Sequence, residues 1–245
     1  MSSTARGVRA RARIEVTAAI KDEARRQLAE EGAAKLSLRA VARELGMASS
    51  ALYRYFPSRD DLLTALIIDA YNAIGAAAES AHDAASGSDP ARRWTLVCEA
   101  VRAWALAHPH EYALIYGSPV PGYTAPQDTV PPAARVGQVF FGITRDAHRS
   151  TGLALPELPA GLRPEAERMT ADLAPDLPPE AVTALVAAWA ELFGLIGFEV
   201  FGQFNRVVED RETFFRHAAD RLARGVGLTP PRQGGSEGTA PARRV

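Results

Sequence analysis

The sequence predicts an all-α protein in which a small N-terminal domain of three helices precedes a larger helical domain. Apolar residues recur at the three- and four-residue spacing of a helix face along most of the chain, whereas the alternating runs typical of β-strands are scarce. Ala, Leu, Arg and Glu are abundant, which also favours helices. With 245 residues and 47% hydrophobic content, the chain can bury a core in one small and one larger domain.

The first predicted helix is marked by Ile20, Ala24 and Leu28, which recur every fourth residue and lie just before Gly32. Glycine ends a helix readily because it enters the left-handed backbone region without a steric cost. Residues 1–13, ahead of this helix, are predicted to form a flexible basic arm. The arginines of this arm are Arg6, Arg9, Arg11 and Arg13.

Residues 37–56 predict two short helices joined by a tight turn. Ser37 is placed to cap the first of them by accepting a hydrogen bond from a free backbone amide. Val41 and Leu45 continue the apolar face that begins one residue after the cap. Gly46 then stands where the helix must stop and turn.

The second of these helices is expected to divide into an inner and an outer face. Leu52 and Phe56 are predicted to point to the core, which leaves Tyr53, Arg54 and Tyr55 on the outside. A helix-turn-helix places its second helix in the major groove of DNA while the first crosses the backbone. The predicted DNA-contacting residues are Ser37, Arg39, Ser49, Ser50, Ala51, Tyr53, Arg54, Tyr55 and Arg59.

The stretch from residue 20 to residue 66 resembles the N-terminal domain of the TetR family of bacterial transcriptional regulators. The residues that carry the resemblance are Gly32, Ser37, Ala42, Gly46, Leu52, Tyr53, Tyr55, Phe56, Pro57, Ser58 and Leu62. One departure is Ala48, where the family commonly has a Ser or Thr that caps the second helix. Losing such a cap costs about 1 kcal/mol unless Ser49 takes over one residue later.

The resemblance implies the domain boundaries and the function. Residues 14–66 are expected to form the DNA-binding domain, with its helix-turn-helix at residues 37–56, and residues 67–228 the effector-binding and dimerisation domain. The implied function is a ligand-responsive regulator, expected to be a repressor. It would bind a palindromic operator of double-stranded DNA as a homodimer and be released by a small hydrophobic or aromatic effector. An activator with the same DNA-binding domain, and a partner-binding module that has lost DNA binding, stay open as alternatives.

The distribution of charge supports a DNA-binding domain independently of the motif. Residues 1–59 hold 12 Lys and Arg against 6 Asp and Glu, a net charge of +6, whereas residues 60–245 hold 16 against 23, a net charge of −7. Neutralisation of phosphates dominates nucleic-acid affinity, so the basic N-terminal part suits a DNA-binding role. The arginines of the arm are expected either to reach a minor groove or to form a solvated tail.

The larger domain is predicted as a series of helices separated by Pro- and Gly-containing breaks. Helices are expected at residues 58–85, 90–107, around Tyr112 and Ile115, and at 135–150, 179–204 and 210–226, with loops at 118–132 and 151–164. Asp89 and Pro90 suit the cap and first turn of the second of these helices. Residues 229–245 are rich in Pro, Gly and Arg and are predicted to be disordered.

The helix at 179–204 is apolar on all sides and must therefore be covered on all sides. We expect one cover from its own subunit and the other from a second copy, in a four-helix interface of the kind that the TetR resemblance implies. The predicted interface residues are Val182, Leu185, Trp189, Leu192, Ile196, Val200, Phe214, Phe215, Ala218 and Leu222. The alternative is a single intrachain core without a dimer.

The larger domain also resembles a TetR subgroup with a Trp-then-His-Gly signature, but Phe193 stands in the place of its histidine. Such domains bind a small effector among their helices. The predicted pocket residues are Trp94, Trp104, Tyr112, Tyr116, Tyr123, Phe140, Phe141 and Phe193. Each of these residues, taken singly, also suits an ordinary core position.

The sequence argues against several other classes of protein. The single cysteine, Cys98, excludes an internal disulfide framework and fits a reducing cytoplasm. No signal peptide or membrane span is predicted. His108 and His110 lie near Glu111, but this arrangement is far commoner at exposed helix starts than in metal sites. Phosphate-loop, metal-ligand and nucleophile motifs are missing, so neither a cofactor nor an enzymatic activity is expected.

Overall fold

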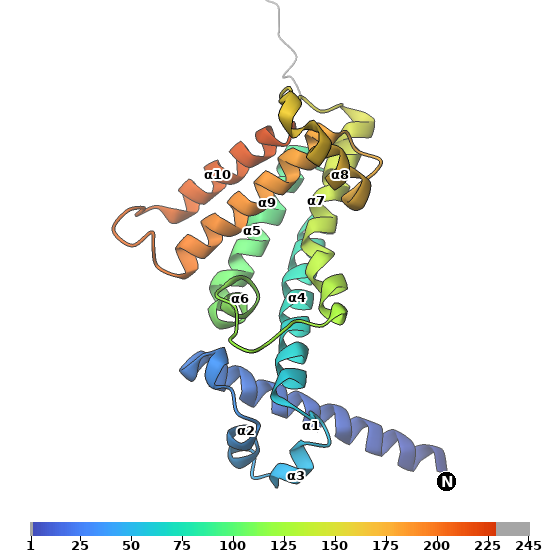
Figure 1. Cartoon of the computed structure of the whole chain (residues 1–245), viewed down its shortest axis with the longest axis vertical. Helices are drawn as coiled ribbons and strands as arrows, with labels where there is room; N and C mark the ends of the chain where they lie inside the picture. Colours follow the sequence, from blue (N-terminus) through green and yellow to red (C-terminus); the bar gives the residue numbers. More distant parts are fainter. Residues whose placement is uncertain (1, 229–245) are drawn as a thin grey trace, which may run out of the picture.

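The structure, a computed structural model, describes residues 2–228 and, within them, no side chain of residues 2–6 or of residue 9. The described residues form ten α-helices joined by loops and three short 3-10 turns, in agreement with the predicted all-α class (Figure 1). The helices are α1 (Ser2–Glu31), α2 (Leu38–Glu44), α3 (Ser49–Leu52), α4 (Arg59–Ala84), α5 (Pro90–Ala107), α6 (Pro109–Tyr116), α7 (Val130–Ser150), α8 (Arg163–Leu173), α9 (Pro179–Val200) and α10 (Arg211–Gly225). The predicted disorder of residues 229–245 lies outside the described residues.

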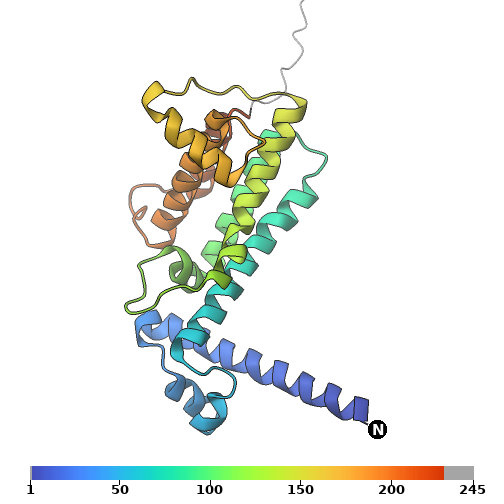
Figure 2. The ribbon, with the colours of Figure 1, turned by 45° about the vertical axis from the view of Figure 1, so that its right-hand side comes forward.

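Two hydrophobic cores divide the molecule, and α4 contributes to both. The core of the N-terminal domain contains Ile20, Leu52 and Leu62, whereas the core of the larger domain contains Ile74 and Trp94. Along α4, residue 66 is the last in the first core and residue 70 is the first in the second. Figure 2 shows α4 rising from the N-terminal domain into the helices of the larger one.

The structure corrects the prediction that residues 1–13 form a flexible arm. From Ser2 onward these residues belong to α1, which runs without a break to Glu31 and projects beyond the rest of the N-terminal domain (Figure 1). Alanine and arginine are strong helix formers, and the segment lacks proline, so helix propensity accounts for the difference. The side chains of Arg6 and Arg9 lie outside those described.

Three further helices differ from the prediction. Helix α7 begins at Val130 rather than at residue 135, because the prolines that follow Val130 fit the first turn of a helix. Helix α8 was not predicted, and it lies between the predicted loop and α9. Helix α9 ends at Val200 rather than at residue 204, since Gly202 has a φ of 82°.

Helices α4 and α7 pack closely because a glycine faces an arginine between them. A Cβ atom on Gly75 would lie 2.8 Å from the Cβ of Arg135. The Arg135 Nε donates to Glu79 Oε1 at 2.8 Å, and its Nη1 donates to the Asn72 carbonyl at 2.9 Å. The hydrogen bond from Arg135 lowers the pKa of the Glu79 carboxyl. This contact fixes α7 along α4.

Helices α4 and α9 are long and apolar enough to cross a membrane by length and composition alone. Both of them supply residues to the core of the larger domain, as Ile74 on α4 and Ile196 on α9 illustrate. A helix at the centre of a globular fold can be as apolar as a membrane-spanning helix, because other helices cover it.

A buried ion pair joins α5 to α9. The Arg102 Nε donates to Glu199 Oε2 at 2.7 Å and its Nη2 donates to Oε1 at 2.6 Å, while the guanidinium lies 5.2 Å from the centre of the Phe215 ring. The side chains of Arg102 and Glu199 are only 16% and 6% exposed. Such a pair is costly to break because one charge would remain buried without a partner.

Replacing one member of this pair is therefore predicted to destabilise the fold. Arg102→Leu should lower the free energy of unfolding by about 3–5 kcal/mol, measured by urea denaturation. Arg102→Leu combined with Glu199→Leu should recover most of that loss, because neither charge is then left unpaired. Equal stability of Arg102→Leu and the wild type would contradict the role given to this pair.

Candidate functional site

The first half of the helix-turn-helix has the predicted geometry. The Ser37 side chain accepts a hydrogen bond from the Ala40 backbone amide at 3.4 Å and so caps α2. Val41 is fully buried. Gly46 has a φ of 62°, in the left-handed region, and the chain turns there toward α3. The turn therefore depends on glycine, as the sequence predicted.

Helix α3 begins at Ser49, directly after Ala48. Ala48 holds the N-cap position with φ −64° and ψ 134°, and it offers no side-chain hydrogen bond. Ser49 lies inside the helix, so it does not replace the missing cap. After Leu52 the chain continues in turns through residue 55 rather than in a regular helix. The helix expected to read DNA is consequently short and lacks a side-chain cap.

The predicted DNA-contacting side chains on this helix and beside it gather at one end of the molecule. Ser49, Ser50 and Arg54 are exposed, and Tyr53 is 41% exposed. Arg39, on α2, is also exposed. Helices α2 and α3 form the tip of the molecule farthest from α8 and α10 (Figure 1).

The other predicted DNA-contacting residues are less accessible or are already engaged in contacts within the chain. Ala51 and Tyr55 are partly buried, and the Ser37 hydroxyl is engaged in its cap. The Arg13 guanidinium lies 5.0 Å from the centre of the Tyr55 ring, and its Nη2 donates to the Arg54 carbonyl at 3.5 Å. Arg13 thus ties the N-terminal half of α1 to the turn after α3, while Arg11 is exposed on the same helix.

Arg59 has a structural role that the sequence did not predict. Its Nη2 donates to the carbonyls of Ala33 at 2.8 Å and Ala34 at 3.3 Å, and its Nη1 lies 3.5 Å from Asp60. These two carbonyls belong to the 3-10 turn between α1 and α2 (Ala33–Lys35). Arg59 therefore holds the start of α4 against this turn, with a side chain that is 29% exposed.

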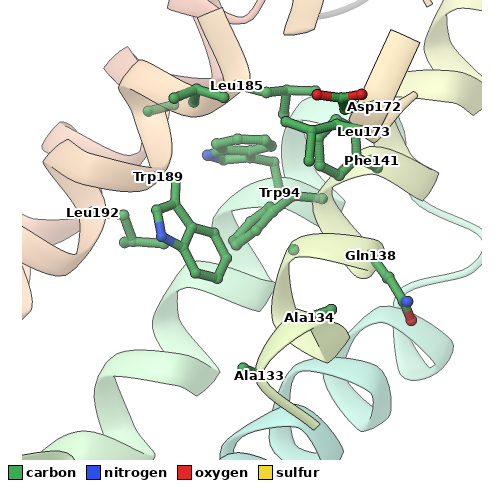
Figure 3. A pocket seen from close by; sticks show the side chains of 14 residues that line it. Trp94, Ala133, Ala134, Gln138, Phe141, Asp172, Leu173, Leu185, Trp189 and Leu192 are labelled. Atoms are coloured by element: carbon green, nitrogen blue, oxygen red, sulfur yellow. The ribbon is translucent and has the colours of Figure 1, made fainter. Parts of the chain in front are cut away.

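A cavity of about 370 Å³ lies in the larger domain between α5, α7, α8 and α9 (Figure 3). Its walls are mostly aromatic and aliphatic, and its polar side chains are Gln138 and Asp172, which are exposed. The lining residues are Trp94, Ala133, Ala134, Gly137, Gln138, Phe140, Phe141, Asp172, Leu173, Leu185, Val186, Ala188, Trp189 and Leu192. A cavity of this size and polarity suits a small organic ligand.

Three of the eight predicted pocket residues line this cavity, namely Trp94, Phe140 and Phe141. The other five do not, because neighbouring side chains engage them. Trp104 stacks on His108 with 5.0 Å between ring centres, and the Tyr123 hydroxyl lies 2.9 Å from that of Thr64. Tyr112, Tyr116 and Phe193 form a separate aromatic cluster.

This aromatic cluster joins the cavity wall to α6. The Trp189 ring, which lines the cavity, lies 4.5 Å from the Phe193 ring, and Phe193 stacks on Tyr116 at 4.1 Å. The Tyr112 hydroxyl donates to the Phe193 carbonyl at 2.9 Å. Burial raises the pKa of both tyrosines well above the usual range, so their hydroxyls stay protonated.

From α6 an ion cluster leads to the N-terminal domain. The Arg25 guanidinium, on α1, donates from Nε to Glu111 at 2.9 Å and from Nη2 to Asp69 at 2.7 Å. Lys21 lies 2.7 Å from the same Asp69 carboxylate. These side chains are each between 19% and 31% exposed, so water screens the cluster only in part. Arg25 thereby connects α1 to both α4 and α6.

The residues predicted to form a dimer interface divide into two groups. Val182, Leu185, Leu192, Ile196, Phe215, Ala218 and Leu222 are at most 5% exposed in the single chain. They pack inside their own subunit, and Leu185 and Leu192 line the cavity together with the partly buried Trp189. The prediction is wrong for these seven, because the sequence showed that α9 is apolar all round but not which side faces inward.

The outer side of α9 and α10 is also apolar. Its exposed large residues are Val186, Phe198, Phe201 and Phe214, with exposures of 40%, 54%, 46% and 40%. Phe214 is one of the residues predicted from the sequence to form the dimer interface. Val200, another of them, is partly buried. The outward residues of α9 are as apolar as the inward ones, so the hydrophobic pattern of the sequence carries no signal that separates the two groups.

The remaining candidates have structural explanations. Cys98 is fully buried, and burial raises the pKa of its thiol, which makes it an unreactive core residue. Within the described residues, no group of three or more His, Cys, Asp or Glu side chains could hold a metal ion. His108 is engaged by the Trp104 ring and carbonyl.

Comparison with known proteins identifies the family. Residues 20–66 match the family described as bacterial regulatory proteins, tetR family, and residues 94–222 match the tetracyclin repressor-like C-terminal domain. The chain belongs to the TetR family. The HTH-type transcriptional regulator Rv1816 of Mycobacterium tuberculosis (strain ATCC 25618 / H37Rv) is 40% identical over 202 residues, which cover 81% of this chain and 86% of that one.

Solved structures agree with this assignment. The protein in the crystal structure of SCO4313 is 35% identical, and the match covers 86% of this chain and 97% of that one, with a TM-score of 0.70. That of RolR in complex with resorcinol is 16% identical, covers 90% and 97%, and has a TM-score of 0.51, which shows a shared fold alone. This TetR family member is a DNA-binding transcriptional regulator and not an enzyme.

The uncapped start of α3 generates a prediction about stability. Ala48→Ser supplies a hydroxyl at the N-cap and should raise the free energy of unfolding by about 1 kcal/mol, measured by urea denaturation. Ser49→Ala is the matched control and should change it little, because Ser49 does not cap the helix. A larger loss for Ser49→Ala than gain for Ala48→Ser would show that the cap has been misplaced.

Proposed function

We propose that this TetR family member is a ligand-responsive repressor, which binds a palindromic operator in the cytoplasm as a homodimer and releases it when a small hydrophobic or aromatic effector fills the cavity. The observation that supports this most is the pairing of two features in one chain. An exposed, basic helix-turn-helix forms one end of the molecule, and a cavity of about 370 Å³ lies in the other domain. A regulator that responds to a ligand needs both.

The proposed DNA contacts follow from exposure. Ser49, Ser50 and Tyr53 would meet base edges and sugars in the major groove, while Arg39 and Arg54 would meet phosphates. Arg11 and Arg13 lie along α1 on the same domain and are suited to the flanking backbone or a minor groove. Arg59 contributes chiefly by holding the turn between α1 and α2 in place.

The proposed dimer uses the outer side of α9 and α10. Ala187, Ala190 and Gly194 are exposed on α9 and would let a second helix approach closely, with Phe198 and Phe214 beside them. An exposed apolar surface of this kind on a soluble domain commonly marks an interface. A twofold pair would present two DNA-binding domains to half-sites about 34 Å apart, one helical turn of DNA.

The proposed coupling runs through the contacts around α6. A ligand in the cavity would press on Trp189, and the stack of Trp189, Phe193 and Tyr116 would pass the displacement to α6. Glu111, on α6, is bonded to Arg25 of the DNA-binding domain. RolR, which shares the fold, is described in complex with resorcinol, a small aromatic molecule. An effector can weaken operator binding only if it binds more tightly to the arrangement of the two DNA-binding domains that does not fit the operator.

The experiment that tests this function is a gel-shift of the purified protein against DNA from upstream of its own gene, repeated at several salt concentrations. Tight binding to one palindromic fragment should weaken linearly with salt on logarithmic axes, because phosphate contacts release counterions. A transcription assay in vitro on that promoter should then show less transcript when the protein is added. Increased transcript would identify an activator instead.

Arg54 is predicted to contribute to operator binding. Arg54→Ala should weaken binding about tenfold, as expected for the loss of one charged contact worth roughly 1–2 kcal/mol, and should reduce its salt dependence. Tyr53→Ala should weaken it similarly without changing the salt dependence. Arg92→Ala, which removes an exposed arginine of α5, is the control and should bind as the wild type does. If all three variants bound equally well, the DNA surface would lie elsewhere.

Glu111 is predicted to couple the two domains. Glu111→Gln removes the charge that holds Arg25 while keeping the shape of the side chain, so the drop in operator affinity caused by effector should become smaller. Glu30→Gln, which removes a surface pair with Arg26, is the matched control and should leave that drop unchanged. The measurement is operator affinity with and without effector. An unchanged drop in Glu111→Gln would rule out this route.

A further inference from the structure

We infer that the cavity between α5, α7, α8 and α9 takes a flat aromatic ligand that carries no negative charge. This inference rests on the proposed function, because it names the chemical class of the effector. Two features of the cavity lead to it: the shape of its walls and the charge around its rim.

The walls favour a planar ring. Two indoles face the cavity from different helices, Trp94 from α5 and Trp189 from α9, and Phe140 and Phe141 add two more rings from α7 (Figure 3). Trp94 and Phe140 are already packed together, with 4.4 Å between their centres. Apart from Gln138 and Asp172, the remaining walls are alanine, glycine and branched aliphatic side chains. Aromatic faces at this density bind another ring by offset or edge-to-face contact.

The charges around the cavity disfavour an anion. Among the described residues, the lining includes no lysine, arginine or histidine, and its one charged side chain is the carboxylate of Asp172. The Arg168 guanidinium contacts this lining carboxylate and is itself engaged by it. Arg168 donates to Asp172 at 3.0 Å and to Glu165 at 3.0 Å. A carboxylate ligand would therefore lose its hydration without gaining a counter-charge.

Two probes of matched shape test the charge preference. 2-Acetylnaphthalene is neutral, whereas 2-naphthoate carries a negative charge on the same ring system. Titration calorimetry on the full chain should show that 2-acetylnaphthalene binds and that 2-naphthoate binds more than about tenfold more weakly, because its carboxylate finds no counter-charge in the cavity. Naphthoate binding as tightly as the ketone would overturn the inference.

Two glycines of α7 provide a matched pair of variants for locating the site. A Cβ on Gly137 would lie 3.5 Å from Trp189 Cζ3, so the leucine of Gly137→Leu would occupy the cavity. Gly142 has no atom within 4 Å of such a Cβ and does not line the cavity, so Gly142→Leu is the control. Gly137→Leu should abolish binding of 2-acetylnaphthalene, and Gly142→Leu should preserve it. Binding that survives in Gly137→Leu would place the ligand elsewhere.

Operator binding of the ligand-free protein is measured in parallel. A protein that binds its operator but neither probe would refute this inference while leaving the DNA-binding function intact.

Discussion

Helix α4 is one continuous helix that takes part in two separate hydrophobic cores. Leu62 and Leu63 are fully buried in the core of the DNA-binding domain, while Ile74 and Ala78 are fully buried in that of the larger domain. A helix that is packed at both ends moves as a rigid element, because bending it would break contacts in one core or the other. The orientation of the helix-turn-helix is therefore tied to the packing of the larger domain, and the proposed regulation depends on that constraint.

The contacts around α6 provide a second connection between the same domains, and this connection passes beside the cavity. Tyr112 is bonded to the Phe193 carbonyl inside the larger domain, while Glu111, its neighbour, is bonded to Arg25 in the DNA-binding domain. The two residues face different domains because adjacent positions on a helix point to different sides. A ligand that shifts α9 would thus alter the contacts around α6 but leave the connection through α4 in place. Because only one of the two connections changes, the expected result is a change of angle between the domains.

The features predicted most accurately from the sequence are those that depend on interactions between residues close together in the chain. The cap at Ser37, the turn at Gly46 and the bounds of α5 at residues 90–107 agree with the structure, because capping and left-handed glycine act over a few residues. The inward side of α9 could not be predicted, because a helix that is apolar all round carries no periodic signal, so Leu185 and Leu192 were assigned to the wrong surface. The engagement of Arg59 by the turn between α1 and α2 depends on tertiary packing, which a single sequence does not show.

The proposed regulation requires the cavity and the DNA-binding surface to be linked through the fold. The measurement that tests it most directly is the affinity of the protein for 2-acetylnaphthalene, determined by calorimetry without DNA and again with a saturating operator fragment. Linkage requires the operator to weaken ligand binding by the same factor by which the ligand weakens operator binding. We predict a clear and equal reduction of affinity in both directions. A ligand affinity that is unchanged by a bound operator would contradict it.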